Sequence, residues 1–289
     1  MKKYIFISLL LASCEQPSHT ITELYSLPKK LKEVSGIIYT PEDQSVWAIE
    51  DSGNASALYK INSTGKITKT ISITDAQNTD WEDVTMDKNG NLYLGDFGNN
   101  DNERKDLCIY KVDKNSLLNA TATPVSKISF SYPEQKQFPP NKKELLYDVE
   151  GFFEMNNYFY LFTKNRSKGF DGTSLIYKIP NQAGNHTAIL LGSFKTCDTY
   201  KSCAITSAIL SPDQSEVALL THDKMILFEN FKGDDFLSGT QTVLELNHFS
   251  QKEAATFIDN ERILLADEKY GSDGGKVYKT TLTQLKTKS

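Results

Sequence analysis

One short pattern recurs five times along the 289-residue chain, and it constrains the fold more than any other feature. Each copy places an aromatic residue after an aliphatic one, and a charged residue follows. The copies are Leu58-Tyr59-Lys60, Ile109-Tyr110-Lys111, Ile176-Tyr177-Lys178, Leu227-Phe228-Glu229 and Val277-Tyr278-Lys279. Repetition at a period of some tens of residues indicates a repeat architecture in which each copy belongs to one structural unit.

Two further strand-like columns repeat in step with this pattern. One column is residues 46–49, 92–94, 158–161, 217–220 and 263–266, and the other is residues 34–37, 81–84, 149–152, 205–208 and 253–255. A fourth run follows in the first four units, at residues 67–73, 124–130, 187–194 and 240–246. These runs are short, apolar or alternating, and bounded by Gly, Asn, Asp and Pro, which predicts an all-β fold.

The fifth unit has only three strands, and residues 21–27 form an unassigned strand before the first unit. That strand would complete the last unit and close a ring, which removes exposed sheet edges. We therefore predict a five-bladed β-propeller of four-stranded antiparallel blades, closed by the N-terminal strand, as a single domain over residues 21–285. A six-bladed alternative would need a blade within residues 132–146, a stretch rich in Pro and Lys.

The N-terminus reads as a targeting segment rather than as structure. Lys2 and Lys3 precede a short apolar run, and Leu11-Ala12-Ser13-Cys14 resembles the lipobox of bacterial lipoproteins. We expect residues 1–13 to be a signal peptide, Cys14 to carry lipid, and residues 14–20 to be a linker. The protein is then anchored to a membrane of the bacterial cell envelope, facing the periplasm or the exterior. The alternative is an ordinary secretory signal with a chance cysteine.

Charge and cysteine content narrow the remaining possibilities. The formal net charge is −5 and basic residues occur only in short, scattered groups, so no nucleic-acid partner is expected. Cys197 and Cys203 stand close together in a polar stretch, and we expect them to pair in an oxidising compartment. Cys108 lies among apolar residues and is expected to be a small buried filler. We expect a monomer.

The predicted innermost strands bring acidic residues to one axis. Aligned across the units, these strands carry Ser35, Glu82, Glu150, Thr206 and Glu253 at one position, and Glu33, Asp80, Asp148, Ala204 and Gln251 two residues earlier. Residues two apart on a strand face the same side, so both sets point into the channel. Converging carboxylates repel one another unless they bind protons or a cation, and a hard cation such as calcium suits oxygen ligands.

The loops after the second strand of each unit open at the same end of the channel and are rich in polar residues. They include Asp51-Ser52-Gly53-Asn54, residues 96–100, residues 163–166, residues 222–224 and residues 267–269. The candidate calcium ligands are Glu33, Asp51, Glu82, Asp96, Glu150 and Glu253. The candidates for holding an anionic ligand beside the metal are Arg104, Lys164, Asn165, Arg166 and Lys269. The structural alternative is that Asp-x-Gly-Asn is a tight turn and that the loop cations are solvated.

Several of these motifs carry a family resemblance. Residues 33–36, 51–54, 80–83, 95–100 and 148–151, read together as EVSG, DSGN, DWED, GDFGNN and DVEG, resemble the SdiA-regulated propellers and related phytase-esterase-like bacterial propellers. The likeness is strongest over residues 31–105 and weak in the fourth unit, where Thr206 replaces Glu. The resemblance implies an envelope propeller with calcium at the channel mouth, and an asymmetric site.

Two functions from different classes are consistent with these features. One is a lipid-anchored binding module whose calcium-binding channel mouth holds a small anionic ligand or a partner protein. The other is a calcium-dependent hydrolase of phosphate esters, lactones or related esters, with Glu82, Glu150 or His222 as candidate catalytic groups. The chain has no nucleophile elbow, zinc motif, phosphate loop or cofactor fingerprint, so catalysis would depend on the acidic residues alone.

Overall fold

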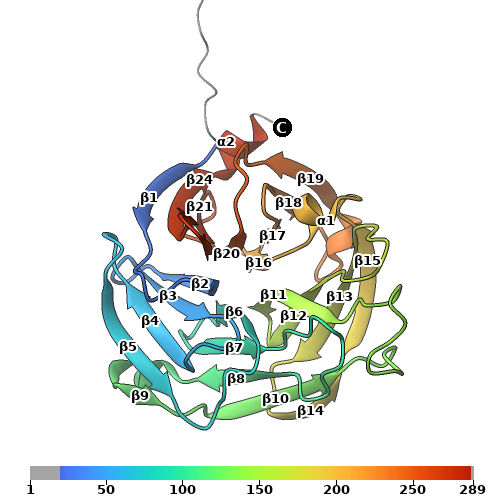
Figure 1. The fold of residues 1–289 in the computed structure, drawn as a ribbon, viewed down its shortest axis with the longest axis horizontal. Coiled ribbons are helices and arrows are strands. Elements are labelled where there is room, and N and C mark those ends of the chain that lie inside the picture. Colours follow the sequence, from blue (N-terminus) through green and yellow to red (C-terminus); the bar gives the residue numbers. More distant parts are fainter. Residues whose placement is uncertain (1–19, 288–289) are drawn as a thin grey trace, which may run out of the picture.

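The repeated units fold as five antiparallel sheets arranged as blades around one axis (Figure 1). This computed structural model describes residues 20–287. The signal segment, Cys14 and most of the linker lie outside the described residues. The predicted five-bladed propeller is confirmed. The six-bladed alternative is wrong, because residues 132–146 form turns and irregular chain with no strand among them.

Each blade runs from an innermost strand beside the axis to an outer strand at the rim. Blade 1 comprises β2 (Val34–Thr40), β3 (Ser45–Glu50), β4 (Ala57–Ile61) and β5 (Ile67–Ile73). Blade 2 comprises β6 (Trp81–Met86), β7 (Leu92–Asp96), β8 (Cys108–Val112) and β10 (Ser126–Ser131). Blade 3 comprises β11 (Asp148–Met155), β12 (Tyr158–Lys164), β13 (Thr173–Pro180) and β15 (Ile189–Lys195). Blade 4 comprises β16 (Ser207–Leu210), β17 (Glu216–Leu220), β18 (Lys224–Glu229) and β19 (Thr240–Glu245).

Blade 5 is built from both ends of the domain. Its inner strands are β20 (Lys252–Phe257), β21 (Arg262–Asp267) and β24 (Lys276–Thr281), and its outer strand is β1 (Thr22–Ser26). β1 pairs antiparallel with β24, and Thr280 Oγ1 donates a hydrogen bond to the Thr20 carbonyl at 2.6 Å. The predicted closure by the N-terminal strand is therefore confirmed.

Two short strands depart from the predicted four-stranded plan. β9 (Thr121–Ala122) pairs parallel with β5, and β14 (Gly184–Thr187) pairs parallel with β10. Each is supplied by the following unit of the chain, so blades 1 and 2 each gain a fifth strand that covers their outer edge. The start of the run predicted at residues 187–194 thus separates into β14, which belongs to blade 2, while β15 begins at Ile189.

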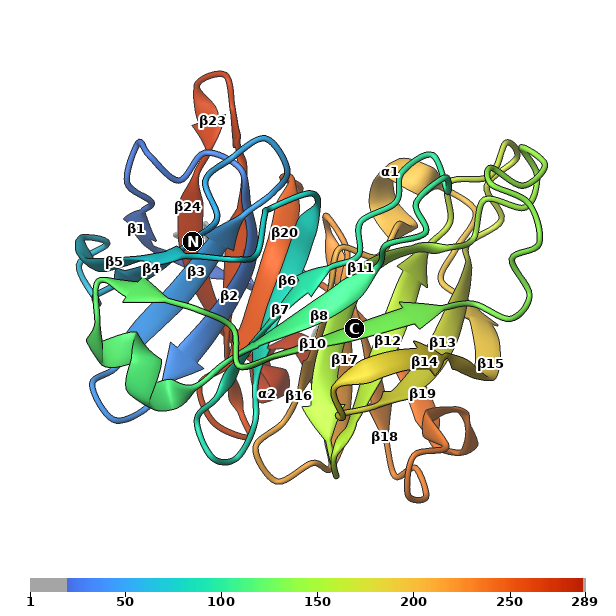
Figure 2. The same cartoon turned by 90° about the horizontal axis from the view of Figure 1, so that it is seen from below.

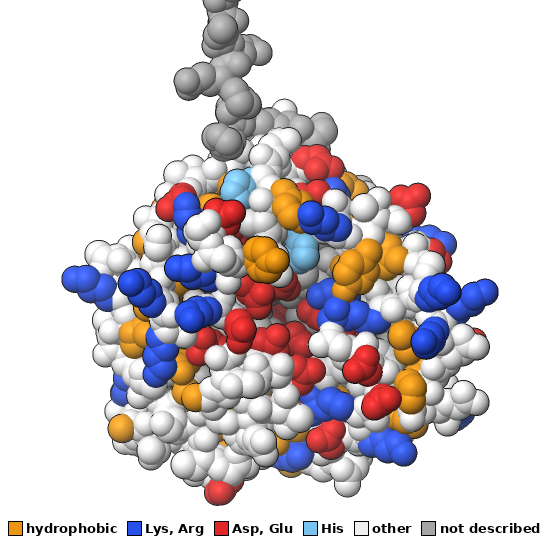
Figure 3. All heavy atoms as spheres, in the orientation of Figure 1, with side chains coloured by type: hydrophobic (Ala, Val, Ile, Leu, Met, Phe, Trp, Pro, Cys, Tyr) orange, Lys and Arg blue, Asp and Glu red, His pale blue; other side chains and the backbone are white. Residues whose placement is uncertain are grey.

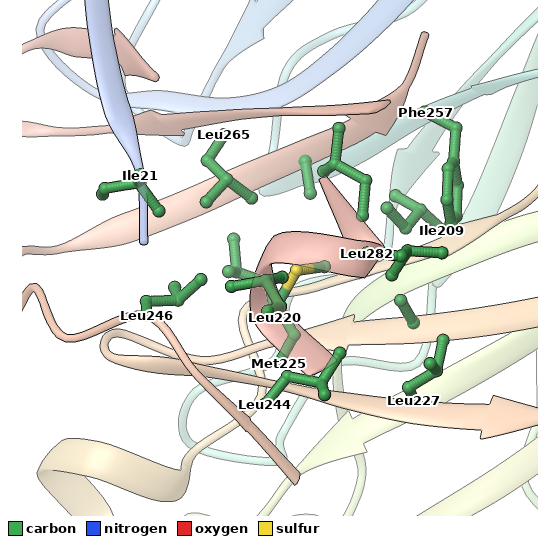
Figure 4. Close-up of a cluster of buried hydrophobic side chains, with 14 of the residues drawn as sticks. Ile21, Ile209, Leu220, Met225, Leu227, Leu244, Leu246, Phe257, Leu265 and Leu282 are labelled. Carbon is green, nitrogen blue, oxygen red and sulfur yellow. The ribbon is translucent and has the colours of Figure 1, made fainter. Parts of the chain in front are cut away.

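The apolar core is divided into five clusters, each between the facing sides of two adjacent blades. Figure 4 shows the cluster between blades 4 and 5, to which Leu220, Leu265 and Ile21 belong. Helix α2 (Leu282–Lys286) adds Leu282 and Leu285 to this cluster. Full burial of one such side chain is worth about 2 kcal/mol, so the blades are held together mainly by these contacts.

The remaining elements lie at the ends of the blades. Helix α1 (Tyr200–Cys203) and the hairpin of β22 (Lys269–Tyr270) and β23 (Asp273–Gly274) rise from one face of the ring, as the side view in Figure 2 shows. The 3₁₀ helices are η1 (Lys114–Leu118) and η2 (Phe236–Ser238). Cys197 and Cys203 form a disulfide, with their Cα atoms 5.6 Å apart, and Cys108 is buried. The helices of the described chain are too short or too polar to span a membrane.

Candidate metal centre

Four of the five innermost strands carry a β-bulge, and the extra residue is in each case the one on which the strands align. The pairing of β2, β6, β11 and β20 with the next strand skips one residue, which is Ser35, Glu82, Glu150 and Glu253 respectively. A bulge lifts its residue out of the hydrogen-bond ladder and re-aims the side chain. In blade 4, β16 begins at Ser207, just after Thr206.

These five residues line one small cavity at the mouth of the channel. The cavity has a volume of about 120 Å³ and also takes in Asp51 and Glu268. Figure 3 shows acidic side chains gathered at the centre of this face, with basic side chains at their margin. The aligned residues of the innermost strands therefore converge as predicted. The cavity that they line also contacts the loops that follow the second strands.

The carboxylates form two groups that share Glu82. One group is Asp51, Asp80 and Glu82, and the other is Glu82, Asp148 and Glu150. Within each group, one oxygen from every residue lies within 4.8 Å of the others. Such spacing allows three carboxylates to bind a single cation.

Glu82 stands between the two groups without a counter-charge. It is 7% exposed, and among the described residues no hydrogen-bond donor or cationic side chain bonds its carboxylate. Burial, reinforced by the charges of Glu150 and Asp51, holds the pKa of Glu82 well above its ordinary value. A buried carboxylate with no partner is costly, so this position requires either a proton or a cation.

The pKa values of the other two members of the first group, Asp51 and Asp80, are also raised. Burial and the charges of Asp51 and Asp148 raise the pKa of Asp80 to about 7. Burial likewise raises the pKa of Asp51. Glu268 is not part of the group but lies in the same cavity, and burial and the charge of Glu253 raise its pKa to about 8. Full ionisation of the first group is therefore unfavourable unless a cation binds it.

The second group, in contrast, has counter-ions from blade 3. Arg166 donates from Nε to Asp148 Oδ2 at 2.5 Å and from Nη2 to Glu150 Oε1 at 2.6 Å. Lys164 Nζ lies 3.1 Å from Glu150 Oε2. Burial would lower the pKa of Lys164, but the adjacent Glu150 carboxylate raises it above its ordinary value. Asp148 Oδ1 also accepts a hydrogen bond from the Asn99 backbone at 2.6 Å.

Two predicted ligands lie at the edge of the cavity. Glu253 Oε1 is 3.1 Å from His222 Nε2, whose ring Nδ1 is 3.0 Å from the Lys201 carbonyl. Glu33 is exposed and accepts a hydrogen bond from Asn54 Nδ2 at 2.7 Å. Glu253 and Glu33 thus belong to neither group of carboxylates, and His222, a candidate catalytic residue, pairs with Glu253.

Four other predicted site residues are used elsewhere. Asp96 is buried in an ion pair with Arg104 at 2.9 Å, and Arg104 also donates to the Gly98 carbonyl at 2.8 Å. Asn165 bonds Asp171 within its own loop at 3.0 Å. Lys269 lies exposed on the β22–β23 hairpin. Asp96 and Arg104 therefore brace the loop after β7.

Asp83 follows Glu82 on β6 and is buried. Its carboxylate accepts hydrogen bonds from the backbone of Val84 at 2.8 Å and Phe152 at 3.3 Å, and from Ser207 Oγ at 3.4 Å. These donors come from three blades. The absence of a side chain at Gly151 lets the backbone of Ala208 on β16 approach closely, since a Cβ atom at position 151 would stand 2.3 Å from the Ala208 nitrogen.

A larger cavity of about 430 Å³ opens at the opposite end of the axis. Its walls include Met86, Phe153 and Phe257. Its buried acid, Asp87, is already bonded by Asn91 and Tyr93. The buried, unpartnered carboxylate of Glu82 lies instead in the smaller cavity.

Residues 16–138 match the family model described as SdiA-regulated, so the family resemblance is confirmed over that stretch. No curated protein matches the chain.

Solved structures resemble the chain in fold. The PQQ-bound aldose sugar dehydrogenase of Streptomyces coelicolor aligns with a TM-score of 0.53 at 9% identity, over 90% of this chain and 98% of that one. The calcium-binding protein regucalcin of Agrobacterium tumefaciens strain C58 aligns with a TM-score of 0.46 at 11% identity, over 86% of this chain and 90% of that one. At 9% identity the likeness to the dehydrogenase concerns the fold alone.

Proposed function

We propose that this β-propeller, whose N-terminal part carries the SdiA-regulated pattern, binds Ca²⁺ at the mouth of its channel through Asp51, Asp80 and Glu82. Lipid on Cys14 would anchor it to a membrane of the bacterial envelope, where it works as a monomer. The observation that carries the proposal is the buried Glu82 carboxylate, which has no partner among the described residues and faces other carboxylates.

Charge repulsion supports a cation in this group. Two unit charges 4 Å apart repel by about 4 kcal/mol at an effective dielectric of 20, so three ionised carboxylates within 4.8 Å destabilise one another strongly. The donors are all carboxylate oxygens, which suit a hard cation, and weak extracellular calcium sites bind at about 10⁻⁴–10⁻³ M. Ca²⁺ takes six to eight oxygen ligands, so three carboxylates would leave positions for water or a ligand.

A small anionic ligand would suit those open positions. Of the cations predicted to hold an anion, Arg104 and Lys164 are engaged with carboxylates, and Lys269 lies on the outer hairpin. Arg166 keeps one guanidinium nitrogen, Nη1, off the carboxylates, and this atom donates to Tyr200 Oη at 2.6 Å. An anionic group bound to the metal could therefore accept hydrogen bonds from Arg166 and Tyr200.

The test is calcium binding by the purified protein, measured by calorimetry and by thermal unfolding. Calcium at millimolar concentration should raise the melting temperature, as a ligand specific for the folded state does. Glu82→Gln and Asp80→Asn should remove most of that rise, whereas Glu42→Gln, an exposed change on the β2–β3 turn, should keep it. If the wild-type protein shows no rise and Glu82→Gln is the more stable protein without calcium, the carboxylates hold protons and the proposal fails.

A hydrolase acting on anionic esters is the second candidate, because Glu268 lies in the same cavity and has its pKa raised to about 8. A carboxyl group that titrates near neutral pH is suited to proton transfer. Glu150 is a weaker candidate base, since Lys164 and Arg166 engage both of its oxygens. Calcium-dependent release of nitrophenol from nitrophenyl phosphate or acetate, lost in Glu268→Gln, would support this candidate. Calcium binding without turnover of either substrate would exclude the hydrolase for these substrates and favour the binding module.

A further inference from the structure

Arg166 supplies positive charge to the second carboxylate group. Its Nε and Nη2 atoms bond Asp148 and Glu150 at 2.5 and 2.6 Å, which brings its positive charge to two members of that group. The third member, Glu82, receives no bond from Arg166. The group thus has a cation on one side and an unpartnered, 93%-buried carboxylate on the other.

The guanidinium is held in this position from outside by Tyr200. Arg166 Nη1 donates to Tyr200 Oη at 2.6 Å, and the Tyr200 ring packs edge-on against Phe170. Tyr200 begins α1 in the loop that the Cys197–Cys203 disulfide closes. All three polar nitrogens of the guanidinium are therefore engaged, two by carboxylates and one by a residue of this closed loop.

We propose that Glu82, Asp148 and Glu150 form a second divalent-cation position, which Arg166 fills in place of an ion. This inference rests on the proposed function, because Glu82 would bridge the two positions. Carboxylates that bridge two metal ions are common where ions lie about 4 Å apart. The Arg166 side chain is 22% exposed, whereas the Lys164 side chain is 9% exposed, so Arg166 has more access to solvent. Arg166 is thus the cation that an ion can displace outward.

The chemistry of the position favours a hard cation such as Ca²⁺. Its donors are again carboxylate oxygens only, and the nearby Lys164 keeps one Glu150 oxygen engaged. The retained Lys164 would make the second position weaker than the first, since its charge repels an incoming ion. The wild-type protein should therefore bind one ion first and a second ion only at higher calcium concentration.

The experiment counts calcium ions per protein by calorimetry, in the wild-type protein and in two variants. Arg166→Gln removes the competing charge and should bind two ions instead of one. Tyr200→Phe keeps the charge but removes one hydrogen bond to it, so a second ion should bind at roughly tenfold lower calcium concentration than in the wild type. The matched control is Arg262→Gln, which removes an exposed arginine paired with Asp259 and should still bind one ion.

The outcomes separate this inference from the proposed function. One ion in the wild type, and one ion at unchanged affinity in both variants, would overturn the second position while leaving the first. No binding by the wild type but binding by Arg166→Gln would support the second cation position and overturn the proposed function. No binding by any of the proteins would overturn both. If Arg166→Gln fails to fold, Tyr200→Phe decides the question by itself.

Discussion

Gly98 on the loop after β7 lies directly against the Glu82 carboxylate. A Cβ atom at position 98 would stand 2.1 Å from Glu82 Oε1 and 2.5 Å from Asp80 Oδ2. The loop is held there because Gly98 N donates to the Asp80 carbonyl at 3.1 Å and Asn99 N donates to Asp148. The absence of a side chain at Gly98 is therefore a condition for placing two carboxylates of the first group side by side.

Gly98→Ala should damage the calcium site more than the fold. The added methyl group would push Glu82 and Asp80 away from it, and at least a tenfold loss of calcium affinity is expected, about 1.4 kcal/mol. Calorimetric titration with calcium measures this effect. Gly192→Ala is the matched control, because a Cβ there meets only the end of the Leu237 side chain. Equal calcium affinity in Gly98→Ala and the wild type would contradict the placement.

The number and order of the blades were predictable from the sequence because each blade repeats the same hydrophobic pattern. The aromatic residues Tyr59, Tyr110 and Tyr177 recur at equivalent positions. The last unit lacks a fourth strand and an unassigned strand precedes the first unit, which together imply closure. The parallel strands β9 and β14 were not predictable, because each is a short polar segment that joins a blade other than its own.

The site was predictable only in part. Strand alignment predicted that Glu82 and Glu150 lie at the site. The β-bulges that aim these two side chains inward cannot be predicted from the alternation of polar and apolar residues. Asp80 and Asp148 stand two residues earlier and could have been chosen as ligands on that spacing. The pairing of Arg166 with Asp148, and the support from Tyr200, depend on contacts between loops distant in sequence.

Removal of residues 1–27 should destroy the closure of the ring. Blade 5 would lose β1, and β24 would become an exposed edge strand, which favours aggregation. Ile21 and Leu27 would also leave the clusters that join blade 5 to its neighbours. We expect a melting temperature lower by at least about 5 °C or an insoluble protein, whereas removal of residues 1–18 should have little effect. An unchanged melting temperature after the longer truncation would refute the closing role of β1.

Lipid attachment at Cys14 remains a prediction, because that residue lies outside the described part of the chain. Protein expressed in a bacterial host should incorporate labelled fatty acid and sediment with membranes. Cys14→Ser should abolish the label, whereas Cys108→Ser, at a buried thiol, should keep it. An unlabelled wild-type protein in the soluble fraction would point instead to an ordinary secretory signal.

Asp83→Ala should destabilise the propeller from its centre. The carboxylate accepts hydrogen bonds from Val84, Phe152 and Ser207, so its removal leaves buried donors of several blades without an acceptor. We expect a loss of about 3 kcal/mol in the free energy of unfolding, and a smaller loss for Asp83→Asn, which keeps one acceptor oxygen. Urea unfolding measures both, with the exposed Asp101→Ala as a control near zero. Equal stability of Asp83→Ala and the wild type would refute the view that the Asp83 carboxylate stabilises the contact between these blades.

Lys252 should make stability depend on pH in the alkaline range. This lysine is fully buried in blade 5, where its Nζ donates to the carbonyls of His222 at 2.9 Å and His248 at 2.7 Å and to Ser250 Oγ at 3.1 Å. Burial lowers its pKa to about 8, against an ordinary value of 10.5. Between those values the unfolded chain binds more protons than the folded one, so the contribution of Lys252 to the free energy of unfolding rises with pH.

The difference in unfolding free energy between the wild type and Lys252→Met isolates this effect, because Met does not titrate. The wild-type value should rise relative to the variant by at most about 3.4 kcal/mol, mostly between pH 8 and pH 10.5, and the difference should be flat well below pH 8. The hydrogen bonds to the ammonium favour its charged form and make the rise smaller than that bound. Urea unfolding at a series of pH values measures the difference, and a constant difference across the window would mean that Lys252 titrates as it does in the unfolded chain.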